Sequence, residues 1–282
     1  MRRNGAVLVT GASTGIGEAT AAHLAQRGHT VFAGVRKQAD ADRLRGRASG
    51  ITPLFLDVTD EAQIEAAAKT IAETMGDRGL DGLVNNAGIG RGGPIEFLAV
   101  DEWRSQLEVN VIGQVAVTRA MLPLIRKATG RIVFVGSIGG RVPTPFIAPY
   151  NSSKFALAAI ADSLRGELHA FGIHVSLIEP GAVKTEIWEK GRRKTDELES
   201  DLPPEAIERY GKVLKTAHRL IDYQEKIGIA PVKVAEAIEH ALTSRRPKPR
   251  YLVGKDARAQ ALLARFVPIR AREALIRKFL RL

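Results

Sequence analysis

The alternation of strand-like and helix-like patterns over residues 1–180 restricts the fold of this chain more than any other feature. Short apolar runs predict strands, and segments with apolar residues at helical spacing predict the helices between them. Repeated β-α units favour a parallel sheet covered by helices on both faces. The predicted fold class is therefore α/β, with a single doubly wound domain. The predicted strands cover residues 6–10, 30–35, 54–56, 80–85, 131–137 and 174–179.

A charged, helical-looking stretch, residues 186–228, interrupts this alternation after the sixth strand. Insertions after the carboxyl ends of strands build ligand sites in open α/β sheets, so we expect a helical substrate lid here. Asp101 is expected to cap a long helix that runs to about Arg126. The other predicted helices cover residues 15–27, 60–75, 150–170 and 232–244, and residues 250–253 are expected to supply a final strand.

The composition excludes several classes of protein. The chain has 282 residues and no cysteine, which excludes disulfides, thiolate metal sites and cysteine nucleophiles. No apolar run approaches the length of a membrane-spanning helix, and no signal-peptide pattern precedes the first strand, so a cytoplasmic location is expected. The six histidines are not at metal-ligand spacing, and we expect no metal site.

The net charge of +11 is concentrated at the carboxyl end, because residues 245–282 hold 12 Lys/Arg against 2 Asp/Glu. The rest of the chain is nearly neutral, so the overall charge does not indicate a nucleic-acid partner. Apolar residues at helical spacing predict two short basic amphipathic helices divided by Pro268. The predicted apolar stripes are Leu262, Leu263 and Phe266, then Leu275, Ile276, Phe279 and Leu280, opposite Arg270, Arg277 and Arg281.

We therefore divide the chain into a body, residues 1–254, and a basic amphipathic tail, residues 255–282. One interpretation is that the stripes of the tail dock on protein, either its own or a partner subunit. The other is that they lie on an anionic membrane surface, which would make the protein peripheral to a membrane. No recognised motif or aromatic interleaving accompanies the charge, so nucleic-acid binding is not expected.

A glycine-rich segment, residues 10–17, lies directly between the first predicted strand and the first predicted helix. Glycines permit a tight turn and let the backbone approach a pyrophosphate, while the helix amino terminus offers free N–H groups to the anion. A plain tight turn is the alternative, and the strand-to-helix context favours a dinucleotide site. The residues expected to line this site are Gly11, Ser13, Thr14, Gly15, Ile16 and Gly17.

The spacing of Gly11, Gly15 and Gly17 resembles the cofactor loop of the short-chain dehydrogenase/reductase family, and further motifs of that family follow in order. The resemblance covers about residues 5–254 and implies a Rossmann-type domain that binds a nicotinamide cofactor. The matching positions are Asp57-Val58, Asn85-Asn86-Ala87-Gly88, Asn110, Ser137, Tyr150, Lys154, Pro180-Gly181, Val183 and Thr185.

The end of the second strand predicts which nicotinamide cofactor binds. An acidic side chain there would bond to the adenosine ribose hydroxyls and repel a 2′-phosphate, but the chain has Val35 followed by Arg36 and Lys37. A guanidinium beside the ribose suits a phosphate, and family members with arginine here typically prefer NADP(H). A solvated pair of cations at a strand end is the alternative. We expect NADP(H), with NAD(H) less favoured.

Tyr150 and Lys154 are four residues apart, so both point to one face of the predicted helix. A tyrosine with a pKa near 10 is a poor acid–base group at neutral pH, and we expect the lysine cation to lower that pKa. The phenol would then donate a proton during carbonyl reduction and accept one during alcohol oxidation. A surface contact between the two side chains is the alternative for the pair taken alone.

The family resemblance implies roles for the remaining candidate residues. Ser137 would hold the substrate oxygen beside Tyr150, and Lys154 would also bond to the nicotinamide ribose. Asn110 would position a water that relays protons to Lys154, and Thr185 would contact the carboxamide. Family members usually form dimers or tetramers through the two long helices, so a homo-oligomer is expected.

The substrate is expected to lie between residues 138–149 and the lid. The residues expected to form its apolar walls are Val142, Pro143, Phe146, Ile147 and Pro149, with Trp188, Leu198, Leu202, Ile207, Tyr210 and Leu214 from the lid. Packing of the insertion against the body is the alternative for most of the lid residues. An apolar cleft favours a hydrophobic alcohol or carbonyl compound, and residues 150–157 with the extended carboxyl end resemble the retinol and hydroxysteroid dehydrogenases.

The sequence thus predicts an NADP(H)-dependent oxidoreductase that interconverts a hydrophobic alcohol and its ketone or aldehyde. Within enzymes, the alternatives are an NAD-dependent dehydrogenase and a 3-oxoacyl reductase of the same family. Outside enzymes, the alternative is a regulatory or scaffold protein that binds nucleotide without turnover. The complete set of Ser137, Tyr150 and Lys154 argues against the last alternative.

Overall fold

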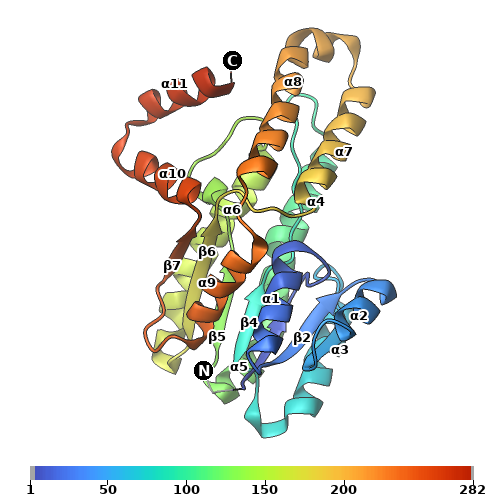
Figure 1. Cartoon of the computed structure of the whole chain (residues 1–282), viewed down its shortest axis with the longest axis vertical. Coiled ribbons are helices and arrows are strands. Elements are labelled where there is room, and N and C mark those ends of the chain that lie inside the picture. Colours follow the sequence, from blue (N-terminus) through green and yellow to red (C-terminus); the bar gives the residue numbers. More distant parts are fainter. Residues whose placement is uncertain (1–3, 281–282) are drawn as a thin grey trace.

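The chain folds around one seven-stranded parallel sheet in the order β3-β2-β1-β4-β5-β6-β7 (Figure 1). The structure, a computed structural model, describes residues 4–280, without the side chains of Lys190, Lys194, Leu198, Asp201, Val213, Ala217, Phe279 and Leu280. The strands are β1 (Ala6–Val9), β2 (Thr30–Val35), β3 (Ile51–Phe55), β4 (Gly82–Asn85), β5 (Arg131–Val135), β6 (His174–Pro180) and β7 (Arg250–Val253).

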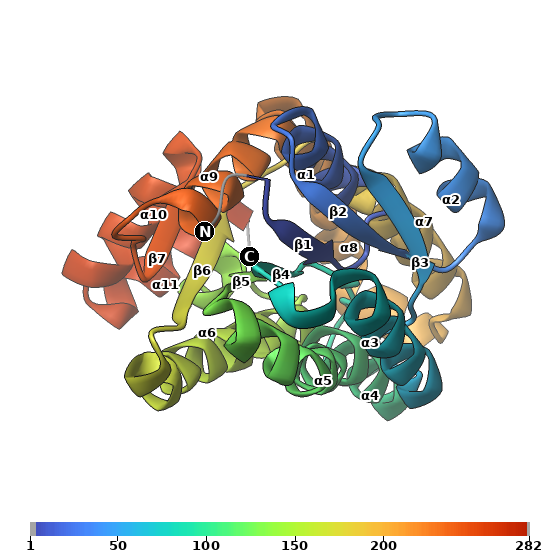
Figure 2. The same cartoon turned by 90° about the horizontal axis from the view of Figure 1, so that it is seen from below.

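Helices cover both faces of the sheet, as the alternating pattern predicts (Figure 2). Helices α1 and α9 pack together on one face, and α3, α5 and α6 lie on the other. The α-helices are α1 (Gly15–Gln26), α2 (Gln38–Arg45), α3 (Glu61–Met75), α4 (Val100–Leu107), α5 (Gly113–Ala128), α6 (Ala148–Leu168), α7 (Ile187–Asp201), α8 (Pro204–Ile227), α9 (Pro231–Thr243), α10 (Lys255–Phe266) and α11 (Ile269–Leu280). Short turns of helix are η1 (Gly76–Arg78), η2 (Glu108–Ile112), η3 (Ile138–Gly140) and η4 (His169–Phe171).

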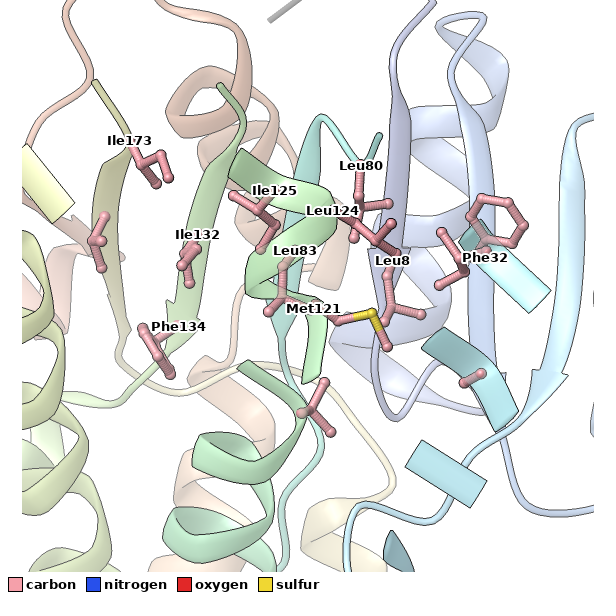
Figure 3. Close-up of a cluster of buried hydrophobic side chains, with 14 of the residues drawn as sticks. Leu8, Phe32, Leu80, Leu83, Met121, Leu124, Ile125, Ile132, Phe134 and Ile173 are labelled. Atoms are coloured by element: carbon pink, nitrogen blue, oxygen red, sulfur yellow. The ribbon is translucent and has the colours of Figure 1, made fainter. Parts of the chain in front are cut away.

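The sheet separates two hydrophobic cores because successive side chains of a strand point to opposite faces. In β1, Leu8 packs in the core under α3, α5 and α6, whereas Val7 and Val9 pack under α1 and α9. Figure 3 shows Leu8 among the fully buried side chains of Phe32 and Met121. Burial on both faces explains why the strands are near-continuous apolar runs.

The strand order reverses at β1, which pairs with β2 on one side and with β4 on the other. The connections after β1 and β4 therefore diverge at the carboxyl edge of the sheet, where doubly wound folds bind their ligands. The predicted α/β doubly wound class is confirmed, and its switch point lies between the glycine-rich segment and residues 86–88.

Three local predictions differ from the structure. The third strand starts at Ile51 rather than at residue 54 and includes Pro53, which is tolerated because β3 is an edge strand. Helix α2 was not predicted, because only Ala41 and Leu44 are buried in it. The prediction that Asp101 caps a helix is wrong, since α4 begins at Val100, and the expected single helix is interrupted by the π-helical turn η2 before α5.

The insertion forms two paired helices, α7 and α8, and its helical character is confirmed. Arg192 on α7 forms ion pairs with Asp222 and Glu225 on α8, which join the two helices. The ring of Tyr210 on α8 lies edge-on to Phe97 and to Phe146, at centroid distances of 5.9 and 6.2 Å. The lid is therefore attached to the body through an aromatic cluster. The side chain of Leu198, a predicted lid residue, lies outside the described part.

The tail forms two helices, α10 and α11, on either side of Pro268, as predicted. Proline lacks the N–H that a continuing helix would need, which explains the break. The predicted stripe residues Phe279 and Leu280 have side chains outside the described part, and Arg281 lies beyond it. Within residues 4–280, no helix has both the length and the apolar content needed to cross a bilayer.

Candidate active site

The glycine-rich segment forms a tight loop from the end of β1 to the first turn of α1. Gly11 has φ +60°, which favours glycine, and a Cβ on Gly17 would collide with the carbonyl oxygen of Gly11. Thr14 precedes α1 without a side-chain cap, and among the described side chains none accepts a bond from the N–H groups of the first turn. These N–H groups, with the positive end of the helix dipole, fit the pyrophosphate of a dinucleotide.

The loop after β4 holds the glycine-rich loop in place. The Asn86 amide donates to the carbonyl oxygens of Thr10 (2.9 Å) and Gly11 (3.0 Å). In return, the Thr10 hydroxyl accepts from the backbone N–H groups of Asn86 and Ala87, both at 3.0 Å. These bonds join the two sides of the switch point. Gly88, the last residue of this loop motif, faces the side chain of Asn110, which is a predicted catalytic residue.

The basic residues at the end of β2 lie beside the predicted adenine-contacting aspartate. The Arg36 guanidinium is 3.5 Å from a carboxylate oxygen of Asp57 and is exposed, as is Lys37. Burial alone would raise the pKa of Asp57, but bonds from the Thr59 N–H and hydroxyl and the charge of Arg36 together lower it below its usual value. Val58 is buried against Gly113.

Sequence reasoning missed Arg43, which lies on the unpredicted helix α2. Its guanidinium donates to the carbonyl oxygen of Ser13 in the glycine-rich loop. It also pairs at 2.7 Å with Glu18 on α1 and with Asp40. Arg43 thus braces the loop from outside. The only available signal was an arginine in a short polar segment, which is typical of a solvated surface.

Ser137, Tyr150 and Lys154 converge at the carboxyl edge of the sheet. Ser137 follows β5 and its hydroxyl accepts from the N–H of Gly139 at 3.1 Å. The side chains of Ser137 and Tyr150 lie close together, since a Cβ at Gly139 would be 3.4 Å from the Ser137 hydroxyl oxygen and 3.5 Å from a carbon of the Tyr150 ring. Lys154, one turn further along α6, is buried, and its Nζ lies 5.6 Å from the centre of the Tyr150 ring. The ammonium group donates to the Val135 carbonyl oxygen at 2.9 Å.

The electrostatics of this group differ from the prediction. Burial raises the pKa of Tyr150 above its usual value, and the nearby Ser137 hydroxyl opposes that rise only in part. Burial also lowers the pKa of Lys154 to about 8. The prediction that Lys154 lowers the pKa of Tyr150 is therefore wrong for the chain alone, because desolvation disfavours both charged forms.

Asn110 connects the loop after β4 to the first turns of α6. Its side-chain oxygen accepts from the N–H of Ile89 at 2.8 Å. Its amide donates to the Ile89 carbonyl oxygen and to the Ser153 hydroxyl, both at 3.0 Å, and Ser153 donates to the carbonyl oxygen of Tyr150 at 2.7 Å. Asn110 thus contacts the catalytic helix through Ser153 rather than through Lys154. Its expected role in positioning a water stays a prediction.

Gln106 is a second residue that sequence reasoning missed. Its fully buried side chain accepts from the N–H of Arg91 (2.7 Å) and donates to the Ile89 carbonyl oxygen (2.8 Å). Together with Asn110 it fixes residues 89–91 beside the Tyr150 ring. Amides in a helix are common on surfaces, and only burial shows that this one is structural.

The segment after β6 lies on two sides of the cleft. Thr185 faces the position of Gly15 in the glycine-rich loop, and both border an open pocket of about 780 Å³. Val183 is buried, and its carbonyl oxygen accepts from the Trp188 indole N–H at 2.7 Å. Pro180 and Gly181 lie towards α10: the Asp256 carboxylate packs against Gly181 and accepts from the N–H of Ala182 at 2.8 Å. Among residues 4–280, no three His, Asp or Glu side chains gather at metal-binding distance.

A dinucleotide-type loop and a Ser–Tyr–Lys group on one edge of a doubly wound sheet are typical of oxidoreductases that act on alcohols and carbonyls. Residues 5–196 match the family model described as short chain dehydrogenase. The chain belongs to the short-chain dehydrogenase/reductase family, in the branch of the retinol and hydroxysteroid dehydrogenases.

Individual relatives support this placement. The chain is 40% identical over 257 residues to 17-beta-hydroxysteroid dehydrogenase type 6 of Bos taurus, covering 89% of this chain and 81% of that protein. It is 35% identical over 282 residues to retinol dehydrogenase 5 of Mus musculus, covering 96% and 87%.

Two solved structures share the fold closely and differ in their cofactor. A short-chain dehydrogenase from Burkholderia cenocepacia in complex with NADP has a TM-score of 0.74, 25% identity and 99% coverage of both chains. A short-chain dehydrogenase/reductase from Burkholderia phymatum in complex with NAD has a TM-score of 0.78 and 25% identity, and covers 93% of this chain and 94% of that one. The fold therefore accepts either nicotinamide cofactor.

Proposed function

We propose that this protein is an NADP(H)-dependent oxidoreductase that interconverts a hydrophobic primary or secondary alcohol and its aldehyde or ketone, with a steroid-, retinoid- or lipid-like skeleton. The observation that carries the proposal is the close approach of the Ser137 and Tyr150 side chains, with the ammonium group of Lys154 one helical turn away. This group faces a loop that fits a dinucleotide pyrophosphate.

Each catalytic residue has a distinct role in this proposal. During reduction the Tyr150 hydroxyl donates its proton to the carbonyl oxygen, and during oxidation the phenolate accepts the alcohol proton. Ser137 holds the substrate oxygen by a hydrogen bond. Lys154 binds the nicotinamide ribose, and Asn110 keeps the α6 turn in position through Ser153. The bound nicotinamide supplies the hydride in reduction and accepts it in oxidation.

The cofactor is held by groups from five loops. The glycine-rich loop binds the pyrophosphate, Arg36 and Lys37 bind the 2′-phosphate, and Asp57 contacts the adenine. The proposed cofactor-binding residues are Gly11, Ser13, Thr14, Gly15, Ile16, Gly17, Arg36, Lys37, Asp57, Val58, Asn86, Ala87, Gly88, Tyr150, Lys154, Pro180, Gly181, Val183 and Thr185.

Replacing Arg36 tests the preference for NADP(H). We expect Arg36→Ala to raise the NADPH dissociation constant about tenfold, because a solvent-exposed guanidinium contributes about 1.4 kcal/mol to phosphate binding. The NADH dissociation constant should change little, since NADH has no 2′-phosphate. Fluorescence titration of both cofactors measures this, with the equally exposed Arg104→Ala as control. Tighter NADH binding by the unmodified protein would support the NAD-dependent alternative.

A substrate panel tests the proposed chemistry. The edge-on contacts of Tyr210 with Phe97 and Phe146 place aromatic rings between the lid and the body, and such rings suit an apolar skeleton. We expect retinaldehydes or ketosteroids to be reduced with a kcat/KM at least about tenfold above that of a 3-oxoacyl thioester. The absorbance of NADPH follows the reaction. A faster 3-oxoacyl substrate would favour the reductase alternative, and cofactor binding without any turnover would favour a regulatory protein.

The expected assembly into dimers or tetramers and the expected cytoplasmic location stay predictions. Whether the tail contacts protein or an anionic membrane surface is taken up next.

A further inference from the structure

One face of α10 is fixed to the edge of the sheet that holds the catalytic group (Figure 1). Ala257 and Ala261 are buried and pack with Ile138 of η3, the turn that follows Ser137, and with Leu252 of β7. The small alanine side chains let the helix approach closely. The orientation of α10 relative to the catalytic edge is therefore set by packing.

The opposite face of α10 is apolar and exposed. Leu262, Leu263 and Phe266 leave 59%, 43% and 70% of their surface accessible, and we call these three residues the outer face. At helical spacing they lie on the side of the helix away from Ala257 and Ala261. Large apolar side chains grouped in this way mark a surface that meets a partner.

Exposed cations lie on α10 itself and on α11, the helix that follows it. Arg258 and Arg265 on α10 and Arg270 and Arg277 on α11 are exposed, and within residues 4–280 no carboxylate pairs with any of them. The Arg265 guanidinium lies 5.3 Å from the centroid of the Phe266 ring. Apolar residues bordered by unpaired arginines are typical of helices that lie in a lipid headgroup region.

The positive charge of the tail indicates which partner can cover the outer face. The described part of the chain does not cover it, since Leu262, Leu263 and Phe266 all remain exposed on the side of α10 opposite Ala257 and Ala261. A symmetric contact with a second copy would bring two tails together, each with a net charge of +10 over residues 245–282. A nucleic acid would match the charge but leave the apolar side chains uncovered. An anionic bilayer surface matches the positive charge and also covers the apolar side chains.

We propose that the outer face of α10 and its flanking arginines dock on an anionic lipid bilayer, with Leu262, Leu263 and Phe266 inserted among the headgroups. The packing of α10 on η3 then holds the catalytic edge close to the lipid. The docking itself is independent of catalysis, whereas delivery of a lipid-dissolved substrate to the cleft rests on the proposed function.

Vesicle sedimentation with the full chain tests the proposal. Leu262→Ser/Phe266→Ser should weaken binding to vesicles of phosphatidylcholine and phosphatidylserine at least about tenfold, because two apolar side chains no longer leave water. Phe55→Ser/Phe171→Ser is the matched control, since these rings are 52% and 53% exposed elsewhere on the surface, and it should bind like the unmodified protein. Vesicles of phosphatidylcholine alone, or added salt, should reduce binding because arginines contribute through charge.

Each result decides the proposal. Equal binding by the tail variant and the unmodified protein would overturn it, as would equal binding to neutral and anionic vesicles. A smaller molecular mass of the tail variant in lipid-free solution would assign the outer face to a protein contact and also overturn it. Tyr150→Phe should bind vesicles normally, which separates a failure of this proposal from a failure of the proposed catalysis.

Discussion

Tyr150→Phe is expected to lower kcat by about 10³-fold or more, since general acid–base catalysis contributes factors of 10²–10⁴. The substitution removes only the hydroxyl that exchanges a proton with the substrate oxygen. The ring keeps its packing on α6, and Lys154 keeps its bond to the Val135 carbonyl oxygen. The fold and the affinity for NADPH should therefore be retained.

Steady-state kinetics with the best substrate of the panel, together with an NADPH titration, measure both parts of this expectation. Tyr251→Phe is the control, because it also removes a hydrogen-bonded hydroxyl, which contacts Lys248 and His240 away from the cleft. It should leave kcat within about twofold of the unmodified protein. Retention of a tenth or more of kcat by Tyr150→Phe would refute the acid–base assignment.

The second large effect is on stability. The pKa of Lys154 falls from 10.5 to about 8 in the fold, which corresponds to about 3 kcal/mol against the charged form. Lys154→Met removes this penalty but also the bond to the Val135 carbonyl oxygen, which contributes about 1 kcal/mol. We therefore expect the free energy of unfolding to rise by about 2 kcal/mol at pH 7, while activity is lost.

The stability difference between Lys154→Met and the unmodified protein should depend on pH. Because the folded-state pKa is below the unfolded one, the unfolded chain binds more protons between pH 8 and 10.5, and the unmodified protein gains stability as the pH rises through that window. The advantage of Lys154→Met is full below pH 8 and shrinks above it. Urea unfolding at pH 7 and pH 9.5 measures it, with the exposed Lys69→Met as control. A pH-independent advantage, or a less stable variant, would contradict the buried-charge interpretation.

The sequence carries the fold and the positions of the candidate site because both depend on local patterns. Apolar runs buried on both faces identify the strands, and Gly11 and Gly17 stand where close backbone contacts require glycine. Ser137 after β5 and Tyr150 in the first turn of α6 then come together, because α6 starts at the edge where the carboxyl ends of the parallel strands meet.

The parts that could not be predicted depend on distant contacts. The raised pKa of Tyr150 follows from burial by residues far apart in the chain, whereas spacing shows only that Lys154 is near. The links from Asn110 to Ser153 and from Arg43 to Ser13 need the packed structure. The sequence predicts the apolar residues Leu262, Leu263 and Phe266 of the tail, but their exposure depends on the alanines that pack the other face of α10 inward.

The contact between Asp256 and the turn at Gly181 makes the start of the tail inseparable from the loop after β6. Any side chain at position 181 would displace Asp256. Loss of the Asp256 carboxylate would leave the N–H of Ala182 without its hydrogen-bond acceptor. The two positions are therefore expected to change together in evolution. If the tail is fused to another enzyme, the junction therefore has to lie after Ala261. The host enzyme then keeps its own residues in place of the Asp256 contact with the turn at Gly181.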